Sequence, residues 1–513
     1  MVSLQAAFVG ALAALALALT LAFAPAPTTL IVDALSVYIA TTGVYRLFFH
    51  PLAKFPGPHL AAVSPSGATI IGDLSGRYAF TVEDALRKYG NVVRIAPNEL
   101  VFMNHQAFID IYGAQHNGRG RFLKTTTVWG TDLLGHASVA DKLLFKFRGA
   151  LTNYELIVWT QADAIFDYIY ARSRYEEPET VLPLLEFINW FAMDVAVKLT
   201  CHDNHAFMTS FDLAHAWNAL APIFQLFGCI PLLRSLLSLV PALLEKLGSF
   251  GFFVGEASAG SLQWLARRPK LFRLVQTIMA KGNWSSFVLV PGIDIEGERR
   301  LVLASFSPMA DWLYFTIVHL LQNPVWCTLL EEEIRPAFPP KLSMEFGAQL
   351  EGLPILDARL LESLRLMARY INGMPRISPG TVIDGCFVPK GVIVQTSVFA
   401  LARNLRYFNE PLQYRPERWL GPYDHGLRNC MGEDVAWMQA KFFVANMMRW
   451  MNISLPEGQA TPDLERLSQY GSWEKPEIMV KFDRVPQDGD SERWGFRRIV
   501  IEAGRWEEFG WRT

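Results

Sequence analysis

The chain carries little charge, and the charge that it has is balanced. Charged residues make up 19% of its 513 residues, and the formal net charge is −2. No stretch forms the basic stripe with which proteins neutralise a phosphate backbone, so a nucleic acid is not an expected partner. Hydrophobic residues reach 51%, which favours association with a membrane.

Cysteine is also scarce. The five cysteines follow no regular spacing, and an odd number without a pattern argues against a disulfide framework and for a reducing compartment. Most cysteines in such a compartment are inert buried thiols, which we expect of Cys201, Cys229, Cys327 and Cys386. Cys430 differs from them, because glycines and an arginine surround it.

Internal repeats and Ser/Gly-rich linkers are absent as well. A chain of this length usually forms several domains, but nothing in the sequence divides it. We therefore expect an N-terminal membrane anchor at residues 1–49, one large domain at 50–485, and a C-terminal extension at 486–513 whose default interpretation is an exposed tail.

The anchor is predicted from an uncharged and almost wholly apolar stretch, Leu4–Ala24. About 20 such residues form a helix that crosses a hydrocarbon core of roughly 30 Å. A cleaved signal peptide is the alternative, but its apolar core would be shorter, and the cationic residues that open such a peptide are missing here. A second apolar stretch, Thr29–Phe49, follows, and either one span with an interfacial helix or a two-span hairpin fits the pattern. Arg46 and Lys54 beyond the first stretch predict that the large domain faces the cytosol.

The large domain has mixed but mostly helical patterns. Gly90–Phe102 predicts a strand pair, and Thr381–Val394 predicts a second hairpin. Apolar residues recur with the helical period of 3.6 in four segments: Phe187–Leu199, Leu301–Leu321, Pro354–Leu366 and Asp434–Trp450. The predicted fold class is mainly α with small β-sheets. The apolar region Trp217–Phe253 is either buried core or a segment that dips into the bilayer.

The frame of Cys430 is suited to an iron ligand. The loop reads Tyr423-Asp-His-Gly426-Leu-Arg428-Asn-Cys430-Met-Gly432. A thiolate ligand to haem needs a backbone that turns tightly around the sulfur, so Gly426 and Gly432 would allow a close approach to the porphyrin. Arg428, two residues before the sulfur, can reach a haem propionate.

This loop resembles the haem-thiolate signature of the cytochrome P450 family, with Tyr423 in place of the usual Phe. Three more segments resemble family motifs in the expected order. They are the hinge Phe55-Pro-Gly-Pro58, the E-x-x-R helix Glu362-Ser-Leu-Arg365 and the meander Pro416-Glu-Arg418-Trp419. The hinge and the strand pair at 90–102 are similar to those of fungal members. The resemblance implies a P450-like single large domain.

The E-x-x-R spacing also occurs at Glu296/Arg299, Glu332/Arg335 and Glu502/Arg505. Such a pair is usually a solvated surface contact of little energetic weight. Glu362 and Arg365 differ because leucines flank them and because a later segment can supply Arg418 as a third partner. The resemblance implies that this triad holds the fold around the haem and takes no part in the chemistry.

The oxygen-activating helix departs from the family pattern A-G-x-[ED]-T, in which an acid and a Thr deliver protons. This chain has Ser305-Phe-Ser307-Pro308, so Ser307 replaces the acid and Pro308 replaces the Thr. A proline inside a helix removes a backbone hydrogen bond and is expected to kink it. Ser305 and Ser307 are the predicted catalytic residues, because each can orient a water, although more weakly.

Two further departures concern the haem surroundings. Only Leu-Gly-Pro separates Trp419 from Tyr423, a shorter run than the family usually has before its Cys loop. Near His136, where fungal members carry a propionate-binding Arg, the chain offers Ala140 and Asp141, with Lys142 as the nearest cation. Arg376 matches the other propionate-binding position.

The resemblance implies a haem-thiolate monooxygenase that inserts one oxygen atom from O2 into a lipophilic small molecule, in fungal secondary metabolism. Cys430 would be the axial ligand of haem b, and NADPH–cytochrome P450 reductase would supply electrons at the endoplasmic reticulum membrane. One alternative is a family member that rearranges or dehydrates an oxygenated substrate, which Pro308 favours. Another is a catalytically silent haem-binding, or merely membrane-anchored, homologue.

Overall fold

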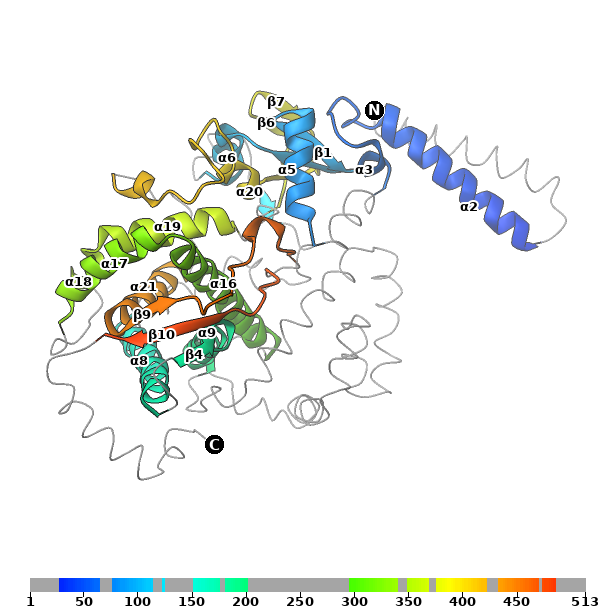
Figure 1. Ribbon diagram of the computed structural model, residues 1–513. Coiled ribbons are helices and arrows are strands. Elements are labelled where there is room, and N and C mark those ends of the chain that lie inside the picture. Colours follow the sequence, from blue (N-terminus) through cyan, green and yellow to red (C-terminus); the bar gives the residue numbers. More distant parts are fainter. Residues whose placement is uncertain are drawn as a thin grey trace. The chain divides into compact units, whose positions relative to one another are not determined.

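The computed structural model describes residues 27–64, 76–113, 122–124, 151–175, 180–201, 295–339, 348–368, 375–421, 432–469 and 473–485. The chain divides into two compact units (Figure 1). The first unit comprises Met1–Thr131, Gln225–Pro241 and Tyr370–Tyr407, and the second comprises Asp132–Phe224, Ala242–Arg369 and Phe408–Thr513.

A five-stranded sheet forms the centre of the first unit. Its strand order is β1-β2-β8-β5-β3, and β2 runs parallel to β8 while the other neighbours are antiparallel. The strands are β1 (Val92–Ala96), β2 (Glu99–Phe102), β8 (Ile393–Thr396), β5 (Arg376–Ile377) and β3 (Leu123–Lys124). A separate hairpin pairs β6 (Thr381–Ile383) with β7 (Cys386–Val388). The predicted strand pair at 90–102 is confirmed, whereas the end of the predicted 381–394 hairpin belongs to β8 and joins the larger sheet.

The described part of the first unit also contains helices. They are α2 (Pro27–Val44), the π-helix η1 (Tyr45–Phe49), α3 (His59–Val63), α5 (Tyr78–Tyr89), α6 (His105–Tyr112) and α20 (Val398–Ala402). Apolar residues of α6, β2 and β8 form one buried cluster, and residues of α5, β1 and α20 form another.

Buried Arg94 of β1 fixes the proline-rich hinge to the sheet. Its Nη1 donates to the carbonyl oxygen of Arg46 at 2.8 Å, and its backbone N–H donates to the carbonyl of Pro56 at 2.8 Å. A Cβ added at Gly57 would lie 2.4 Å from the carbonyl oxygen of Arg94. The close approach of the two backbones therefore requires glycine at this position.

The second unit is mainly helical. Its helices are α8 (Leu151–Tyr175), α9 (Leu184–Cys201), α16 (Ile295–Gln322), α17 (Pro324–Ala337), α18 (Ala348–Glu351), α19 (Pro354–Met367) and α21 (Glu433–Trp450), with 3₁₀ turns η4 (Pro416–Trp419) and η5 (Leu464–Arg466). A small antiparallel sheet has the order β4 (Thr180–Pro183), β10 (Met479–Arg484), β9 (Met451–Ser454). Figure 1 shows α16 running through the middle of this unit, where it contacts α9, α19 and α21.

The predicted fold class, mainly α with small sheets, is confirmed. All four segments predicted as helices from their apolar period fall within α9, α16, α19 and α21. The predicted segments that lie outside the described residues include the apolar segment Leu4–Ala24, the region Trp217–Phe253 and the extension at 486–513. Within the described ranges, no single helix has the length and apolar character to cross a membrane. One bent pair, Ser305–Gln322 with Pro324–Ala337 at 110°, passes that test jointly by length and composition.

Candidate functional site

A buried polar cluster of the second unit centres on Glu362 of α19, whose side chain is fully buried. Arg365 lies one helical turn later and binds the carboxylate with two parallel hydrogen bonds, from Nε to Oε2 and from Nη2 to Oε1, each of 2.8 Å. This bidentate geometry is the strongest arrangement between a guanidinium and a carboxylate. The sequence places the pair on the inner face of α19 because leucines surround both residues.

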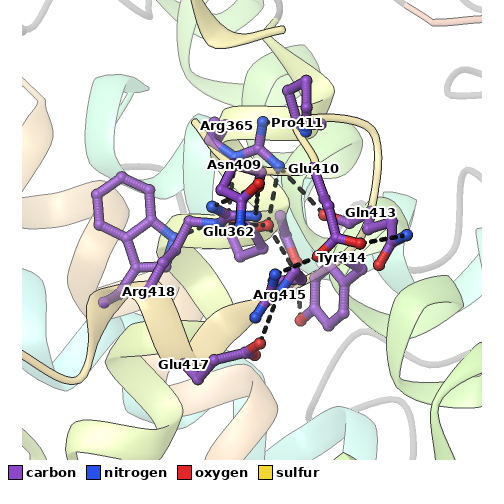
Figure 2. A network of polar contacts seen from close by, with 12 residues as sticks. Glu362, Arg365, Asn409, Glu410, Pro411, Gln413, Tyr414, Arg415, Glu417 and Arg418 are labelled. Carbon is purple, nitrogen blue, oxygen red and sulfur yellow. Dashed lines mark hydrogen bonds and ion pairs between the residues drawn. The ribbon is translucent and has the colours of Figure 1, made fainter. Parts of the chain in front are cut away.

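The segment that ends in η4 completes the cluster (Figure 2). The same carboxylate accepts hydrogen bonds from Arg418 Nε at 3.2 Å, from Trp419 Nε1 at 2.8 Å and from the backbone N–H of Arg415 at 2.9 Å. Burial would raise the pKa of Glu362, but the hydrogen bonds and positive charge of Arg365 outweigh it and hold the pKa below the usual value. The carboxylate is therefore ionised and fully satisfied.

The two arginines also bind the backbone of the meander that precedes η4. Arg365 donates to the carbonyls of Pro411 at 2.7 Å and Gln413 at 3.3 Å, and Arg418 donates twice to the carbonyl of Asn409 at 3.1 Å. Both guanidinium groups lie over the ring of Phe408, at 4.9 and 5.8 Å from its centroid. The structure thus brings together the three residues of the predicted triad and winds residues 408–419 around them.

The competing pairs have other surroundings. Glu332 is exposed, and Arg335 forms its ion pair with Glu331 at 3.1 Å. The side chains of Glu296 and Arg299, and the whole of the Glu502/Arg505 segment, lie outside the described residues.

Ser305, Ser307 and Pro308 lie on α16. The helix runs without interruption from Ile295 to Gln322, as its apolar period predicts, and it includes Pro308. Ser307 is buried and Ser305 is half-buried. Sequence reasoning missed Asp311, a buried acid one turn after Pro308 that forms an ion pair with Lys475. The two residues are 164 positions apart in the sequence, so their pairing could not be predicted. The available signal was a lone acid in an apolar helical stretch.

Arg376 lies on β5 in the first unit and is buried there. Its Nη1 donates to the carbonyl oxygen of Pro375 at 3.2 Å, and its guanidinium lies 5.4 Å from the ring centroid of Tyr112. A buried guanidinium is suited to bind a carboxylate such as a haem propionate.

Most of the predicted cysteine loop lies outside the described residues, namely Tyr423, Gly426, Arg428 and Cys430. Gly432 is described and caps the N-terminus of α21, with φ −96° and ψ 13°. Any residue can adopt this φ, and a Cβ added there would meet no described atom within 4 Å. The described protein atoms alone therefore do not require glycine at 432.

The donor chemistry of these residues fits a haem. Cys430 lies two residues before the cap of α21, a helix of 18 residues. The positive end of a helix dipole favours a thiolate, the form of cysteine that binds iron. Arg428 and Arg376 are cations of the kind that pairs with propionates. The chain thus contains residue types that can hold a haem, namely a thiol for the iron and guanidinium groups for propionates.

Comparisons with known proteins agree with this chemistry. The model of the Cytochrome P450 family matches residues 300–482. Cytochrome P450 monooxygenase TwmD of Talaromyces wortmannii is 31% identical over 88% of this chain and 95% of its own length. BOA3 of Botryotinia fuckeliana is 28% identical over 87% of this chain and 94% of its own, and poxC of Penicillium oxalicum is 27% identical over 87% and 92%. Both are also named cytochrome P450 monooxygenases. The predicted family is confirmed: the chain belongs to the cytochrome P450 family.

Proposed function

We propose that the chain is a haem-thiolate monooxygenase that inserts one oxygen atom from O2 into a lipophilic small molecule. Its similarity to three proteins named as monooxygenases extends over most of their length, which supports this activity. Haem b, when bound through Cys430, would supply the activation of O2, for which an axial thiolate provides electron density.

The observation that carries the proposal is the buried network of Glu362. It takes five hydrogen bonds, three of them from the segment that leads into the cysteine loop. This segment is therefore fixed as far as Trp419. The described chain is thus held up to 11 positions before the proposed ligand Cys430.

On α16, Ser307 is the buried hydroxyl and Ser305 is the half-buried one. A hydroxyl can accept one hydrogen bond while it donates another, so each can hold a water that passes a proton. Neither is acidic enough to replace a carboxyl group as a proton source. The proposed enzyme would therefore move protons less efficiently than members with an acid and a threonine.

The proposed location is the endoplasmic reticulum membrane, with the large domain in the cytosol. The uncharged segment Leu4–Ala24 supports it. Large apolar side chains are also exposed on α2 and η1, including Tyr38 at 60%, Ile39 at 58% and Phe48 at 70%. Exposed apolar groups on consecutive helices suit the interface of a bilayer. The proposed partners are NADPH–cytochrome P450 reductase and a lipophilic substrate of fungal secondary metabolism.

A second candidate is a P450-fold isomerase or dehydratase acting on an already oxygenated substrate. Ser307 and Pro308 favour it, because such a reaction needs the metal but no proton delivery to O2. A catalytically silent haem-binding homologue is the third candidate.

The deciding experiment is the ferrous–CO difference spectrum of the full-length protein in detergent, followed by turnover with NADPH and reductase. A red-shifted Soret band and an NADPH-dependent hydroxylated product are expected. A thiolate spectrum with rearrangement of a hydroperoxide, and no NADPH-dependent product, would favour the isomerase. A protein that retains no haem would overturn both enzymatic proposals.

A further inference from the structure

Helix α16 is continuous across Pro308, although proline cannot donate a backbone hydrogen bond there. In a regular helix the N–H of this position would donate to the carbonyl of Ala304, and the proline ring crowds that carbonyl instead. The turn that carries Ser305 and Ser307 therefore lacks one of its internal hydrogen bonds. Contacts from outside the helix must contribute to holding it in helical form.

A buried ion pair lies one turn further along the helix. The carboxylate of Asp311 binds Nζ of Lys475, and the two side chains are 0% and 1% exposed. The second carboxylate oxygen of Asp311 accepts the backbone N–H of Trp473 at 3.4 Å. Asp311 follows Ser307 by four residues, so both side chains lie on one face of α16. The ion pair is thus placed beside the turn that Pro308 weakens.

The chain around Lys475 is itself firmly held. Residues 473–477, which we call the strap, are fixed to α19 because Trp473 Nε1 donates to the carbonyl of Met367 at 2.9 Å. The ring of Trp473 packs on Phe315, with 5.4 Å between centroids, and the hydroxyl of Tyr314 donates to the carbonyl of Pro476 at 2.7 Å. Because the bond to Met367 anchors the strap on α19, a helix other than α16, Lys475 can transmit that rigidity to Asp311.

We propose that Asp311 and Lys475 are positioning residues. Their ion pair fixes the turn of α16 that carries Ser305 and Ser307, in compensation for the hydrogen bond that Pro308 cannot make. The expected effect on product formation rests on the proposed monooxygenase function. The stabilisation of the α16 turn by the ion pair depends only on the folded chain. A buried ion pair is by itself weak evidence of stabilisation, because apolar replacement of both partners is often neutral. Energetic coupling between the pair and Pro308 is what a positioning role requires.

The test is a double-mutant cycle on the full-length, haem-loaded protein. Asp311→Asn with Lys475→Met removes both charges and leaves neither stranded, and Pro308→Ala restores the backbone donor. Amide hydrogen exchange of peptides covering residues 305–315 is measured in all four proteins, together with product formed per NADPH. With Pro308 present, removal of the pair should speed exchange by about tenfold or more and lower the product ratio by at least about threefold. With alanine at 308, both changes should stay below about threefold.

Equal acceleration in the two backgrounds, or none in the Pro308 background, would overturn the proposal. The conservative Lys475→Arg variant keeps the ion pair and should retain both the slow exchange and the product ratio. A matched control is the ion pair between Asp357 of α19 and Lys441 of α21, 2.7 Å apart. Asp357→Asn with Lys441→Met should affect the 305–315 peptides equally with Pro308 and with alanine.

The ferrous–CO spectrum of each variant separates this proposal from the proposed function. If the unaltered protein gives no thiolate band, the monooxygenase assignment fails, and the exchange cycle still decides whether the ion pair holds the turn. If the band and turnover are normal but the cycle shows no coupling, only the positioning role fails.

Discussion

The indole nitrogen of Trp419 donates a 2.8 Å hydrogen bond to Oε2 of Glu362, a residue 57 positions earlier in the chain. Trp419 is the last residue of η4, so this bond joins the end of the meander to the middle of α19. The same carboxylate forms ion pairs with two guanidinium groups, those of Arg365 and Arg418. Its removal would therefore affect packing, charge and backbone geometry together.

Glu362→Ala should prevent accumulation of haem-containing protein. The substitution leaves Arg365, which is buried, without its ion partner, and breaking a buried pair in this way costs about 3–5 kcal/mol. Arg418 loses the same partner. The measurement is haem content per milligram of purified protein, with thermal unfolding of whatever accumulates. Glu332→Ala removes an exposed acid that also precedes an arginine by three residues, and it should change neither haem content nor thermal stability. Equal losses in the two variants would show that the wrong helix was assigned.

Trp419→Phe tests one bond of the network alone. The phenyl ring keeps the contact with Phe408, whose ring centroid lies 6.3 Å away, but it has no N–H for Glu362. Loss of a hydrogen bond to a charged acceptor should lower the free energy of unfolding by about 1.5–3 kcal/mol while haem is retained. Chemical denaturation provides the value. Glu417→Gln is the neighbouring control, because Glu417 is 41% exposed and its solvent-exposed ion pair with Arg415 should contribute little to stability.

Local patterns in the sequence predicted the positions of helices and strands better than the pairing of the strands. The apolar period placed α9, α16, α19 and α21, and alternation placed β1 and β2. The alternation did not show that β8 belongs to a different sheet from β7. The turn residue Gly391 is compatible both with a chain that returns to pair with β7 and with one that crosses to another sheet. Strand pairing depends on residues far apart in the sequence, such as Phe102 and Thr396.

In the candidate site, too, residues with a local sequence pattern were predicted, whereas contacts between distant residues were not. Glu362 and Arg365 could be found because their spacing and apolar flanks are local, and Arg418 because it lies in a recognisable motif. The ion pair of Asp311 with Lys475 could not be found, since nothing near either residue indicates the other. The helical course across Pro308 was predicted, since the segment Leu301–Leu321 includes that residue, whereas the contacts around its turn depend on residues far away in the sequence.

His319 of α16 should make the protein sensitive to acid. Its ring stacks on Tyr414, with centroids 4.3 Å apart, and burial lowers its pKa from 6.5 to about 3. The unfolded chain therefore binds a proton at a higher pH than the folded one. This contribution to stability is complete above pH 6.5 and is lost as the pH falls towards 3, by up to about 5 kcal/mol.

His319→Phe keeps a stacked ring and removes the titrating group. Its free energy of unfolding should fall less steeply than that of the unaltered protein between pH 6.5 and about 3, as measured by denaturant titration at each pH. His59→Phe, at an exposed position of α3, should follow the unaltered curve. Parallel curves for the unaltered protein and His319→Phe would refute the assignment.

The ligand prediction compares two cysteines. Cys430→Ala should abolish haem retention or leave haem without the thiolate band in the ferrous–CO spectrum, because the proposed axial sulfur is gone. Cys386→Ala changes a half-buried thiol of β7 and should leave both haem content and spectrum intact. Indistinguishable spectra from the two variants would mean that another residue holds the iron.

The last prediction concerns proton delivery from α16. Activation of O2 by a monooxygenase consumes protons, and Ser307 and Pro308 stand where the family usually has an acid and a threonine. The unaltered protein should therefore release much of its reducing power as hydrogen peroxide and form little product per NADPH. Ser307→Glu with Pro308→Thr supplies both groups and restores the backbone donor, so the product ratio should rise several-fold while peroxide falls.

Product per NADPH and peroxide are measured in one membrane preparation with the same reductase. Pro308→Ala is the control, because it restores the backbone donor without adding a proton-donating side chain. A rise in Pro308→Ala equal to that of the double variant would assign the defect to helix geometry. Tight coupling in the unaltered protein would instead show that Ser305, Ser307 or the substrate already carries the proton.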